Sequence, residues 1–343
     1  MLKISTNPYA NFYLNAAHKF GLEYVILNDK LGLARIFNDN ATLDISANVI
    51  GVNTEISSRL AGNKIKTSVL LQEAQLPVPD FKRFKDKEKA MEYAMRQLER
   101  KKRIVIKPIA GSLSVGITVD PTSRTQMKSA LIEAFEGNSS IMIEEYITGK
   151  HYRITVFDGQ IIAITERLAA SVTTDGTSTI NELISRKNGS RKKMKLPPIH
   201  LRKRDLNYLK SMNIKLSKIY KNAKTVILQL GCDLDIGGER RRIKLEDVPS
   251  ENLELFREAL KKLNLRFAGI DYISPDITIP FSEIKTAINE INSAPDSDVH
   301  FRDTYSGDNY AAEKIISQFF SLQDLPLQLV SDHKPTFALS ASI

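Results

Sequence analysis

The sequence predicts a globular fold that mixes helices and strands, and three observations lead to this prediction. Its 343 residues are enough for two or three packed units. Its composition, with 42% hydrophobic and 26% charged residues, is typical of a globular protein. Pairs of strand-like segments alternate with amphipathic helical segments. The clearest pair, residues 152–157 and 160–167, is joined by the turn-forming Asp158-Gly159.

The cysteine content and the hydropathy of the chain bear on its compartment. Cys232 is the single cysteine, which excludes an intramolecular disulfide framework and suits a reducing compartment. No stretch reaches the roughly 20 apolar residues of a membrane-spanning helix. The N-terminal segment has no apolar signal-peptide core. We therefore expect a cytoplasmic protein without membrane contact.

The charge balance indicates anionic partners. The formal net charge is +9, and most of the excess lies at residues 186–204 and 239–242. Nucleic acid, an acidic metabolite and ATP would each fit such a surface, and a run of charges that is only solvated fits equally well. Residues 186–204 contain no interleaved aromatic side chains for stacking on bases, which makes nucleic acid the less favoured partner.

Residues 1–61 are predicted to form a small α/β subdomain. The expected elements are a helix over 11–20, a strand over 23–27 and a hairpin of strands 35–37 and 42–45. This βαβ-like beginning is too small to stand alone, so we expect it to pack against the next unit.

The next unit begins with two helices and a strand that carries a lysine near its end. Apolar residues at helical spacing predict a helix over 63–76, which Pro77 stops. A second, charged helix is expected over about 87–101. Residues 103–108 then form a predicted strand that includes Lys107.

A loop of small residues follows Lys107 at once. Its glycines and serines would let backbone N–H groups and hydroxyls approach phosphate oxygens, and Lys107 would add a positive charge. An ordinary hairpin with a terminal lysine fits the same residues, and no Gly-Lys-Ser/Thr follows, so the loop is not a P-loop. The loop residues that would contact phosphate are Gly111, Ser112, Ser114 and Gly116.

Two further segments could hold a nucleotide and its charge. A helix predicted over 123–135 precedes an apolar strand that runs into a charged hinge at 144–149, whose backbone could pair with the edge of adenine. In the hairpin after it, Arg153 and Arg167 lie at matching ends of the two strands. Arginines on the exposed surface of a hairpin fit this pattern as well.

Helices and one short strand separate this hairpin from the last strand pair. After a first helix and the basic segment, a second helix is expected over about 204–214. A strand over 225–230 and a glycine turn over 232–238 follow, and then a helix over 251–263.

The last strand pair carries the residues with the most specific chemistry. Residues 267–273 and 287–292 read as two strands. Side chains two apart on a strand point to the same face, so Glu290 and Asn292 project together, and Asp271 joins them if the strands pair. Three oxygen donors suit a hard cation such as Mg²⁺. Solvated carboxylates on two edge strands are the alternative.

Several of these segments, in this order, resemble the ATP-grasp carboxylate–amine ligases. Gly-Ile-Asp followed by Glu-Ile-Asn-Ser-Ala-Pro is similar to the metal-binding end of these enzymes, and Ile-Glu-Glu-Tyr-Ile-Thr-Gly resembles their adenine hinge. Residues 63–81 resemble the start of the ATP-grasp domain of cyanophycin synthetases and bifunctional glutathione synthetases. The resemblance runs from about residue 56 to 320. It implies an ATP-grasp fold, in which two α+β lobes grip ATP.

The resemblance also implies how ATP and its metal would be held. Asp271, Glu290 and Asn292 would bind Mg²⁺ beneath the phosphates, while Lys64 and Lys107 would neutralise phosphate charge beside the small-residue loop.

The adenosine part of ATP has its own implied contacts. Glu144 would accept a hydrogen bond from the adenine amine, and Glu145 and Ile147 would contribute backbone groups. His151 occupies the position at which the family normally has an acidic ribose ligand.

The residues expected near the substrate agree with the family pattern at some positions and differ from it at others. Arg153 and Arg167 match arginines of the cyanophycin-synthetase pattern, where they face phosphate and the carboxylate being activated. Ser68 replaces a second lysine of that pattern, and residues 229–233 replace a segment that contains arginine and asparagine. If the replaced segment recognises substrate in the family, the choice of substrate differs in this chain.

These features predict an ATP- and Mg²⁺-dependent ligase that joins a carboxylate to an amine through an acyl phosphate. Its substrate is expected to be an amino acid or an acidic peptide, and the resemblance allows a homo-oligomer. A basic nucleic-acid-binding protein and a non-catalytic ATP-binding regulator are the alternatives. The expected units are an N-terminal subdomain (1–61), a small ATP-grasp lobe (62–146), a C-terminal lobe (147–322) with a basic helical insertion (186–222), and a tail (323–343).

Overall fold

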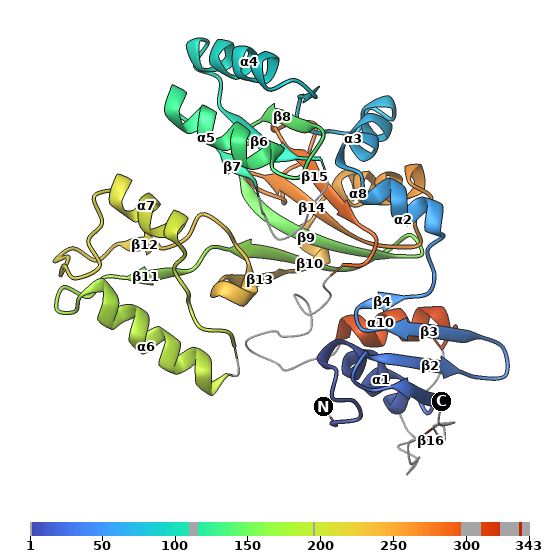
Figure 1. The fold of residues 1–343 in the computed structure, drawn as a ribbon. Coiled ribbons are helices and arrows are strands. Elements are labelled where there is room, and N and C mark those ends of the chain that lie inside the picture. Colours follow the sequence, from blue (N-terminus) through green and yellow to red (C-terminus); the bar gives the residue numbers. More distant parts are fainter. Residues whose placement is uncertain (1, 110–115, 195, 296–309, 323–335, 338–343) are drawn as a thin grey trace.

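The structure is a computed structural model, and it describes residues 2–109, 116–194, 196–295, 310–322 and 336–337 (Figure 1). Helices and strands occur together in these residues, and the strands form four sheets. The predicted α+β class is confirmed. Among the described residues, no helix is both long and apolar enough to cross a membrane.

The N-terminal unit is a helix packed on a mainly antiparallel sheet. Its strand order is β16-β1-β2-β3-β4, and strands β1 to β4 pair antiparallel in succession. The predicted βαβ-like arrangement is therefore wrong, because the loops between these strands are too short for the crossover that parallel strands need. The elements are α1 (Pro8–Lys19), β1 (Glu23–Asn28), β2 (Leu33–Phe37), β3 (Thr42–Ser46), β4 (Val49–Ile50) and β16 (Thr336–Phe337).

The core of this unit extends into the rest of the chain. Helix α1 begins after Asn7, whose side-chain oxygen accepts hydrogen bonds from two backbone N–H groups of the first turn. Tyr13 of this helix lies in one apolar cluster with Phe157, Phe267 and the helix α10 (Tyr310–Phe319). The first unit thus packs against its neighbour, as expected.

A five-stranded sheet forms the centre of the molecule. Its order is β13-β10-β9-β14-β15, and all neighbouring strands are antiparallel. The predicted hairpin and the predicted pairing of the last two strands are confirmed. The basic run at 239–242 belongs to strand β13, whereas the sequence indicated only a charged surface. The elements are β9 (Lys150–Phe157), β10 (Gln160–Leu168), β13 (Glu239–Ile243), α8 (Ser250–Lys262), β14 (Phe267–Ser274) and β15 (Ala287–Asn292).

Alternation along the strands gives this sheet an apolar and a polar face. On β9, Tyr152 and Ile154 pack in one apolar cluster with Phe256 of helix α8. The residues between and beyond them, Arg153 and Thr155, point to the opposite face. Helix α8 therefore covers one face, and polar side chains of the candidate site occupy much of the other.

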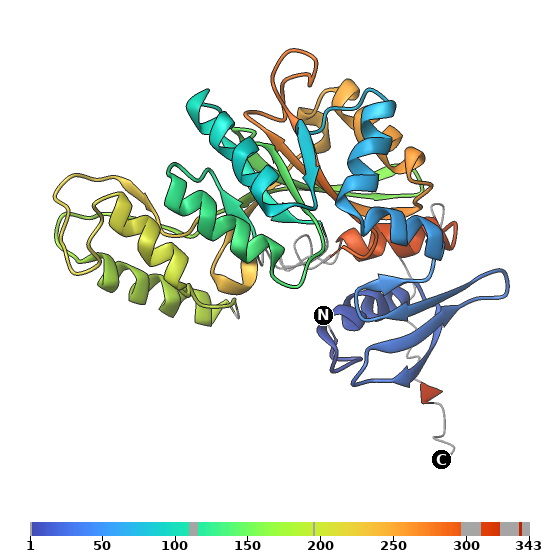
Figure 2. The same cartoon turned by 45° about the horizontal axis from the view of Figure 1, so that its top comes forward.

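A four-stranded sheet with two covering helices forms a second lobe (Figure 2). Helices α4 and α5 pack on the sheet through a cluster that includes Ala90, Ala94, Met127 and Leu131. The sequence analysis predicts neither β5 nor α2, because each is too short to show a clear period. The elements of this lobe are β5 (Phe81–Phe84), α4 (Lys87–Glu99), β6 (Ile104–Pro108), β7 (Thr118–Val119), α5 (Arg124–Phe135) and β8 (Ile141–Glu145). The helices α2 (Glu55–Ala61) and α3 (Lys64–Glu73), which precede them, pack with the central sheet.

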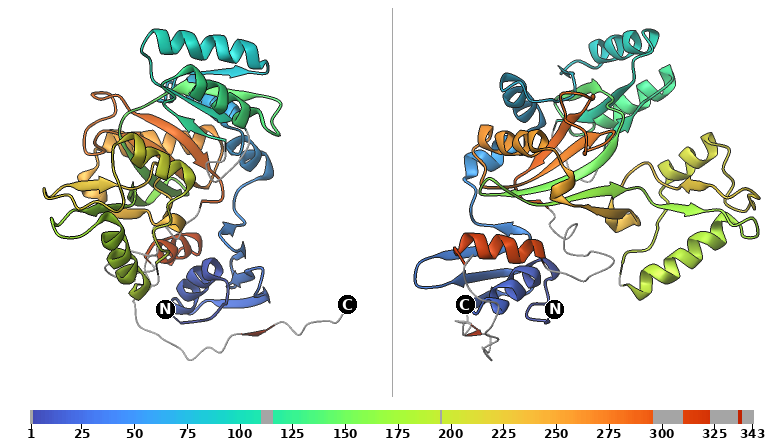
Figure 3. Two further views of the ribbon diagram at one scale, coloured as in Figure 1. Left: turned by 60° about the vertical axis from the view of Figure 1, so that its left-hand side comes forward. Right: turned by 180° about the vertical axis from the view of Figure 1, so that it is seen from behind.

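A smaller unit projects to one side of the molecule beyond the ends of β10 and β13 (Figure 3). It has its own apolar cluster, which includes Val172, Ile180, Leu209 and Val226. The strand predicted over 225–230 is shorter than expected. The elements are β11 (Ser171–Thr173), α6 (Ile180–Lys193), α7 (Lys203–Ser211), β12 (Thr225–Ile227) and the 3₁₀ turn η1 (Leu234–Ile236). A second 3₁₀ turn, η2 (Leu245–Asp247), follows β13 and packs with the central sheet.

Asn252 of helix α8 forms hydrogen bonds with the segment that joins β14 to β15. Its fully buried amide donates hydrogen bonds to the backbone carbonyls of Ile277 (2.9 Å) and Ile279 (2.8 Å). Its side-chain oxygen accepts a hydrogen bond from the N–H of Phe281 (2.8 Å). Buried polar groups that lose their partner cost free energy, so this side chain fixes the path of the chain between the two strands.

We predict that Asn252→Ala lowers the free energy of unfolding by about 2–4 kcal/mol, because three backbone groups, one buried and two partly buried, lose their partner. Chemical denaturation followed by circular dichroism measures this difference. Glu254→Ala, at an exposed position of the same helix, is the control and should change stability by less than about 0.5 kcal/mol. Equal stability of Asn252→Ala and the wild type would contradict the role assigned to Asn252.

Candidate active site

The predicted acidic and amide side chains meet on the polar face of the central sheet. Asp271 of β14 lies opposite Glu290 of β15 in the strand register. The amide nitrogen of Asn292 is 3.5 Å from Asp271 Oδ2. All three side chains are half-buried. The convergence expected from strand periodicity is therefore present.

Two arginines reach the same carboxylate from neighbouring strands. Arg153 Nε lies 2.9 Å and Arg167 Nη1 lies 3.5 Å from Asp271 Oδ1. The two arginines lie near the matching ends of β9 and β10, as expected, but they are not directly opposite each other: Arg153 faces Thr165, and Arg167 faces His151. Both guanidinium groups contact the carboxylate of Asp271 instead.

The surroundings of Arg167 favour its charged form. Partial burial lowers the pKa of Arg167, but the carboxylates of Asp271 and Asp233 act in the opposite direction and the net shift is upward. This guanidinium group is therefore a fixed positive charge at the site.

Gly269 makes room for Arg153. A Cβ atom at Gly269 would lie 2.5 Å from Arg153 Nη1 and 2.6 Å from the Cβ atom of Pro295. Such distances are shorter than any van der Waals contact, so the arginine could not keep its position over a larger residue. Gly269 is two residues before Asp271 and on the same face of β14, a period-of-two signal that could have marked it in the sequence.

Lys64 approaches Asp271, Glu290 and Asn292 from helix α3. Asn63 caps the start of this helix, and Lys64 Nζ is 3.2 Å from Glu290 Oε1. Between α3 and β15 lies an open pocket that both residues line, together with Thr67 and Ser68. The predicted phosphate-binding lysine thus lies beside one of the predicted metal ligands.

Lys107 and Glu144 form a buried ion pair in the other lobe. The two strands β6 and β8 are neighbours, and Lys107 Nζ is 2.7 Å from Glu144 Oε1. Burial raises the pKa of Glu144, while the ammonium groups of Lys107 and, to a lesser extent, Lys64 oppose the rise. Glu290 raises the same pKa slightly, which shows that charges from the two lobes lie close together. Two residues predicted to contact ATP therefore contact each other.

The remaining hinge residues have different surroundings. Glu145 pairs with Lys285, and Ile147 packs with Ile273 and Ala287. The ring of His151 is at the exposed surface, yet nearby protein atoms and the Arg167 cation lower its pKa, against the effect of Asp271. These surroundings therefore favour the neutral form of His151.

The small-residue loop is described only at its end. Gly111, Ser112 and Ser114 lie outside the described residues. Gly116 has a φ angle of +70°, and a Cβ atom there would lie 3.3 Å from the backbone oxygen of Glu133. A glycine is favoured at this position because of its backbone conformation.

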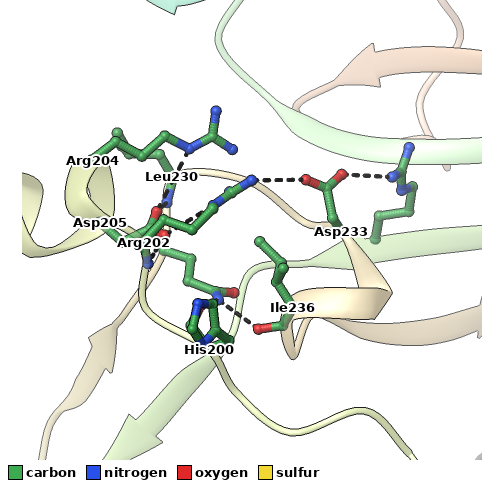
Figure 4. A network of polar contacts seen from close by, with 9 residues as sticks. His200, Arg202, Arg204, Asp205, Leu230, Asp233 and Ile236 are labelled. Carbon is green, nitrogen blue, oxygen red and sulfur yellow. Dashed lines mark hydrogen bonds and ion pairs between the residues drawn. The ribbon is translucent and has the colours of Figure 1, made fainter. Parts of the chain in front are cut away.

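Asp233 belongs to the site, although the sequence analysis assigned it no role. Its Oδ1 atom lies 3.5 Å from Arg167 Nη2, and its Oδ2 atom lies 3.9 Å from Arg202 Nη1 (Figure 4). No local pattern marks this residue, because its partners lie far away in the sequence.

The donor set is suited to a hard cation. Among the residues that the structure describes, no three His, Cys, Asp or Glu side chains are grouped so that they could hold a metal ion. The trio of Asp271, Glu290 and Asn292 is different, since its third donor is an amide oxygen. Carboxylate and amide oxygens are ligands that Mg²⁺ accepts, so these residues fit that ion.

Comparison with known proteins shows that the chain is similar to ligases. Residues 70–225 match the family model for the D-ala D-ala ligase C-terminus. This match, the fold and the relatives described next confirm that the chain is a homologue of ATP-grasp ligases, as the sequence motifs indicated.

The relatives include cyanophycin synthetases and bifunctional glutathione proteins. The chain is 30% identical over 290 residues to cyanophycin synthetase of Synechocystis sp., an alignment that covers 82% of this chain and 32% of that protein. It is 29% identical over 315 residues to the glutathione biosynthesis bifunctional protein of Clostridium perfringens, covering 89% of this chain and 40% of that protein. A bifunctional glutathione synthetase from Pasteurella multocida has the same fold, with a TM-score of 0.63 at 22% identity, over 90% of this chain and 43% of that one. The chain therefore spans well under half the length of these proteins.

We predict that Gly269→Ala displaces Arg153 and weakens the site without unfolding the protein. The added methyl group would occupy the space of the guanidinium group, and relief of this overlap costs about 1–3 kcal/mol of stability. The melting temperature and the crystal structure of the variant measure the two effects. Gly189→Ala is the control, because nothing lies within 4 Å of a Cβ atom there. An unmoved Arg153 in Gly269→Ala would contradict the prediction.

We predict that the thiol of Cys232 is slow to react at neutral pH. Burial raises its pKa to about 11, although the Arg167 cation acts in the opposite direction. The reactive thiolate is therefore scarce below that pH. The rate of alkylation by iodoacetamide should rise steadily from pH 7 to pH 10, and free cysteine, measured in parallel, should level off earlier. A plateau near pH 8 would show that the pKa is not raised.

Proposed function

We propose that the protein is an ATP-dependent ligase that joins a carboxylate to an amine. The observation that supports this best is the convergence of Asp271, Glu290 and Asn292 with two arginines on one face of the central sheet. The similarity to cyanophycin synthetases and glutathione proteins supports the same proposal. In domain terms, we propose that lobes 62–146 and 147–322 enclose ATP, with residues 1–61 as a subdomain and 323–343 as a tail.

ATP would bind with its phosphates over the polar face of the sheet. Lys64 and Lys107 would neutralise phosphate charge, and Glu144, Glu145, Ile147 and His151 would lie near adenosine. Asp271, Glu290 and Asn292 would hold Mg²⁺, which when bound would neutralise the phosphates and polarise the group being transferred. Gly111, Ser112, Ser114 and Gly116 are proposed to cover the phosphates.

The chemistry would proceed in two displacements. An oxygen of the substrate carboxylate attacks the γ-phosphorus, the bond to ADP breaks, and an acyl phosphate forms. The amine nitrogen then attacks the acyl carbon, phosphate leaves and takes up the amine proton, and an amide bond results. Arg153 and Arg167 would stabilise the negative charge that develops on the acyl phosphate and the tetrahedral intermediate, because they are fixed cations in a partly dry site.

An amino acid or an acidic peptide is the proposed substrate. The relatives named for cyanophycin and glutathione synthesis and the net charge of +9 support a carboxylate-bearing molecule. A homo-oligomer and a cytoplasmic location stay predictions.

The nucleic-acid alternative receives no support from the basic segment. Two of its cations are paired within the protein: Arg186 with Asp175, and Lys187 with Glu239. Paired charges are not available to release counterions from phosphates, which is the source of nucleic-acid affinity.

We predict that Glu290→Gln lowers ADP release at least about a hundredfold, because one anionic Mg²⁺ ligand is lost. The assay contains ATP, Mg²⁺ and a panel of amino acids and dipeptides. A second measurement, the affinity for a fluorescent ATP analogue with and without Mg²⁺, should show that the Mg²⁺-dependent part of binding is lost.

Glu283→Gln is the matched control, since Glu283 is an exposed residue between the same two strands. It should leave both measurements unchanged, and circular dichroism should show both variants folded. ADP release by Glu290→Gln at the wild-type rate would refute the assignment of Glu290.

A further inference from the structure

Two arginines of the basic segment converge beside the candidate active site. Arg202 and Arg204 lie on either side of Lys203 at the start of helix α7 (Figure 4). Both arginines are half-buried, whereas Lys203 is exposed. The chain thus turns two cations of this basic run inward and one outward.

Asp205 holds this arrangement in place. It is fully buried, and its Oδ2 atom accepts hydrogen bonds from the backbone N–H (3.0 Å) and from Nε (3.3 Å) of Arg202. Its Oδ1 atom accepts a hydrogen bond from the N–H of Leu230 (3.3 Å), which ties helix α7 to the segment that leads to Asp233. The position of both arginines is therefore set by the fold.

The two guanidinium groups are not fully satisfied by the protein. Among the described residues, the buried atoms Arg202 Nη2 and Arg204 Nε have no hydrogen-bond partner. Arg204 Nε is 4.0 Å from Asp205, too far for a hydrogen bond. Burial and the nearby Arg202 cation lower the pKa of Arg204 despite two carboxylates in the neighbourhood. Both guanidinium groups thus keep a buried N–H group free to donate a hydrogen bond to an anion, among the residues that the structure describes.

Gly231 leaves space between these groups. A Cβ atom at Gly231 would lie 3.3 Å from Arg204 Nη2, 3.6 Å from Arg202 Nη2 and 3.3 Å from Asp233 Oδ2. The ends of both guanidinium groups therefore approach one another over a residue without a side chain. Residues 229–233 are also the segment in which the sequence departs from the ATP-grasp pattern.

Asp233 connects this place to the reaction centre. It lies between Arg202 and Arg167, and Arg167 also contacts Asp271. One carboxylate thus separates the arginine pair from the arginine proposed to stabilise the acyl phosphate. A substrate that reacts beside Arg167 would therefore also contact Arg202 and Arg204, through a group that is a few bonds away from its reacting atoms.

We infer that Arg202 and Arg204 form a subsite for a second carboxylate of the substrate, such as an acidic side chain or the free carboxyl group of an amino acid. Guanidinium groups bind carboxylates with paired, charge-assisted hydrogen bonds. The inference rests on the proposed ligase function for the location of the substrate. It adds that the pair selects substrates with a carboxylate beyond the one that reacts.

The first experiment measures binding without catalysis. The full chain, without ATP, is titrated calorimetrically with a capped aspartyl-aspartate dipeptide, with its neutral asparaginyl counterpart and with inorganic phosphate. The wild type should bind the acidic dipeptide more tightly than the other two. Arg202→Gln and Arg204→Gln should weaken that binding at least about tenfold, as expected for the loss of a charge-assisted hydrogen bond.

Controls separate a lost subsite from a lost fold or a lost net charge. Lys203→Gln removes the same charge from the exposed residue between the two arginines and should bind the acidic dipeptide like the wild type. Arg204→Lys should recover part of the affinity, and circular dichroism should show each variant folded. Wild-type affinity in folded Arg204→Gln, an equal loss in Lys203→Gln, or tighter binding of phosphate than of the dipeptide would each overturn the inference.

The second experiment distinguishes this inference from the ligase proposal. In the ADP-release assay, Arg204→Gln should raise KM for acidic amine or carboxylate substrates at least about tenfold and leave KM for ATP unchanged. Absence of ADP release from the wild type would count against the ligase function, while the binding titration would still decide the subsite. Equal KM values for acidic substrates in the wild type and Arg204→Gln would overturn the subsite.

Discussion

The contact of one carboxylate with two arginines organises the central part of this protein. Asp271 receives Arg153 from β9 and Arg167 from β10, while Glu290 and Asn292 stand beside it on β15. A partly buried carboxylate without cations would be costly, and two guanidinium groups without an anion would repel each other. Contacts between side chains thus help the backbone hydrogen bonds to hold the register of four neighbouring strands, β10, β9, β14 and β15.

Charges of alternating sign continue from this point in both directions. On one side, Glu290 contacts Lys64, and the Lys107–Glu144 pair of the other lobe is near enough to be affected by them. On the other side, Asp233 links Arg167 to Arg202. Because Lys64, Lys107 and Arg167 each already contact a carboxylate, a phosphate or a metal ion that entered would have to exchange partners with paired residues. Through this exchange, nucleotide binding in one lobe would change the ion-pair contacts in the other lobe.

The sequence was sufficient for the parts of the fold and site that depend on short periods. A period of two placed Asp271, Glu290 and Asn292 on one face, and the Asp158-Gly159 turn fixed a hairpin. It was insufficient where contacts join distant residues. The partnership of Lys107 with Glu144, the role of Asp233 and the space that Gly269 leaves for Arg153 depend on which strands become neighbours. In the N-terminal unit the hairpin of β2 and β3 was predicted, but the antiparallel pairing of β1 with β2 was missed, because short strands and one helix are compatible with more than one topology.

The first and last described helices share a core, and this has a consequence for biosynthesis. The apolar side of α1 is covered by Ala311, Ala312, Ile315 and Ile316 of α10, and Lys19 pairs with Glu313. A ribosome makes about 290 further residues after α1 before it begins α10, at roughly 5–20 residues per second. During that interval the nascent N-terminal unit lacks part of its interior, so we expect it to close after translation of the rest of the chain, and to be a binding place for chaperones until then.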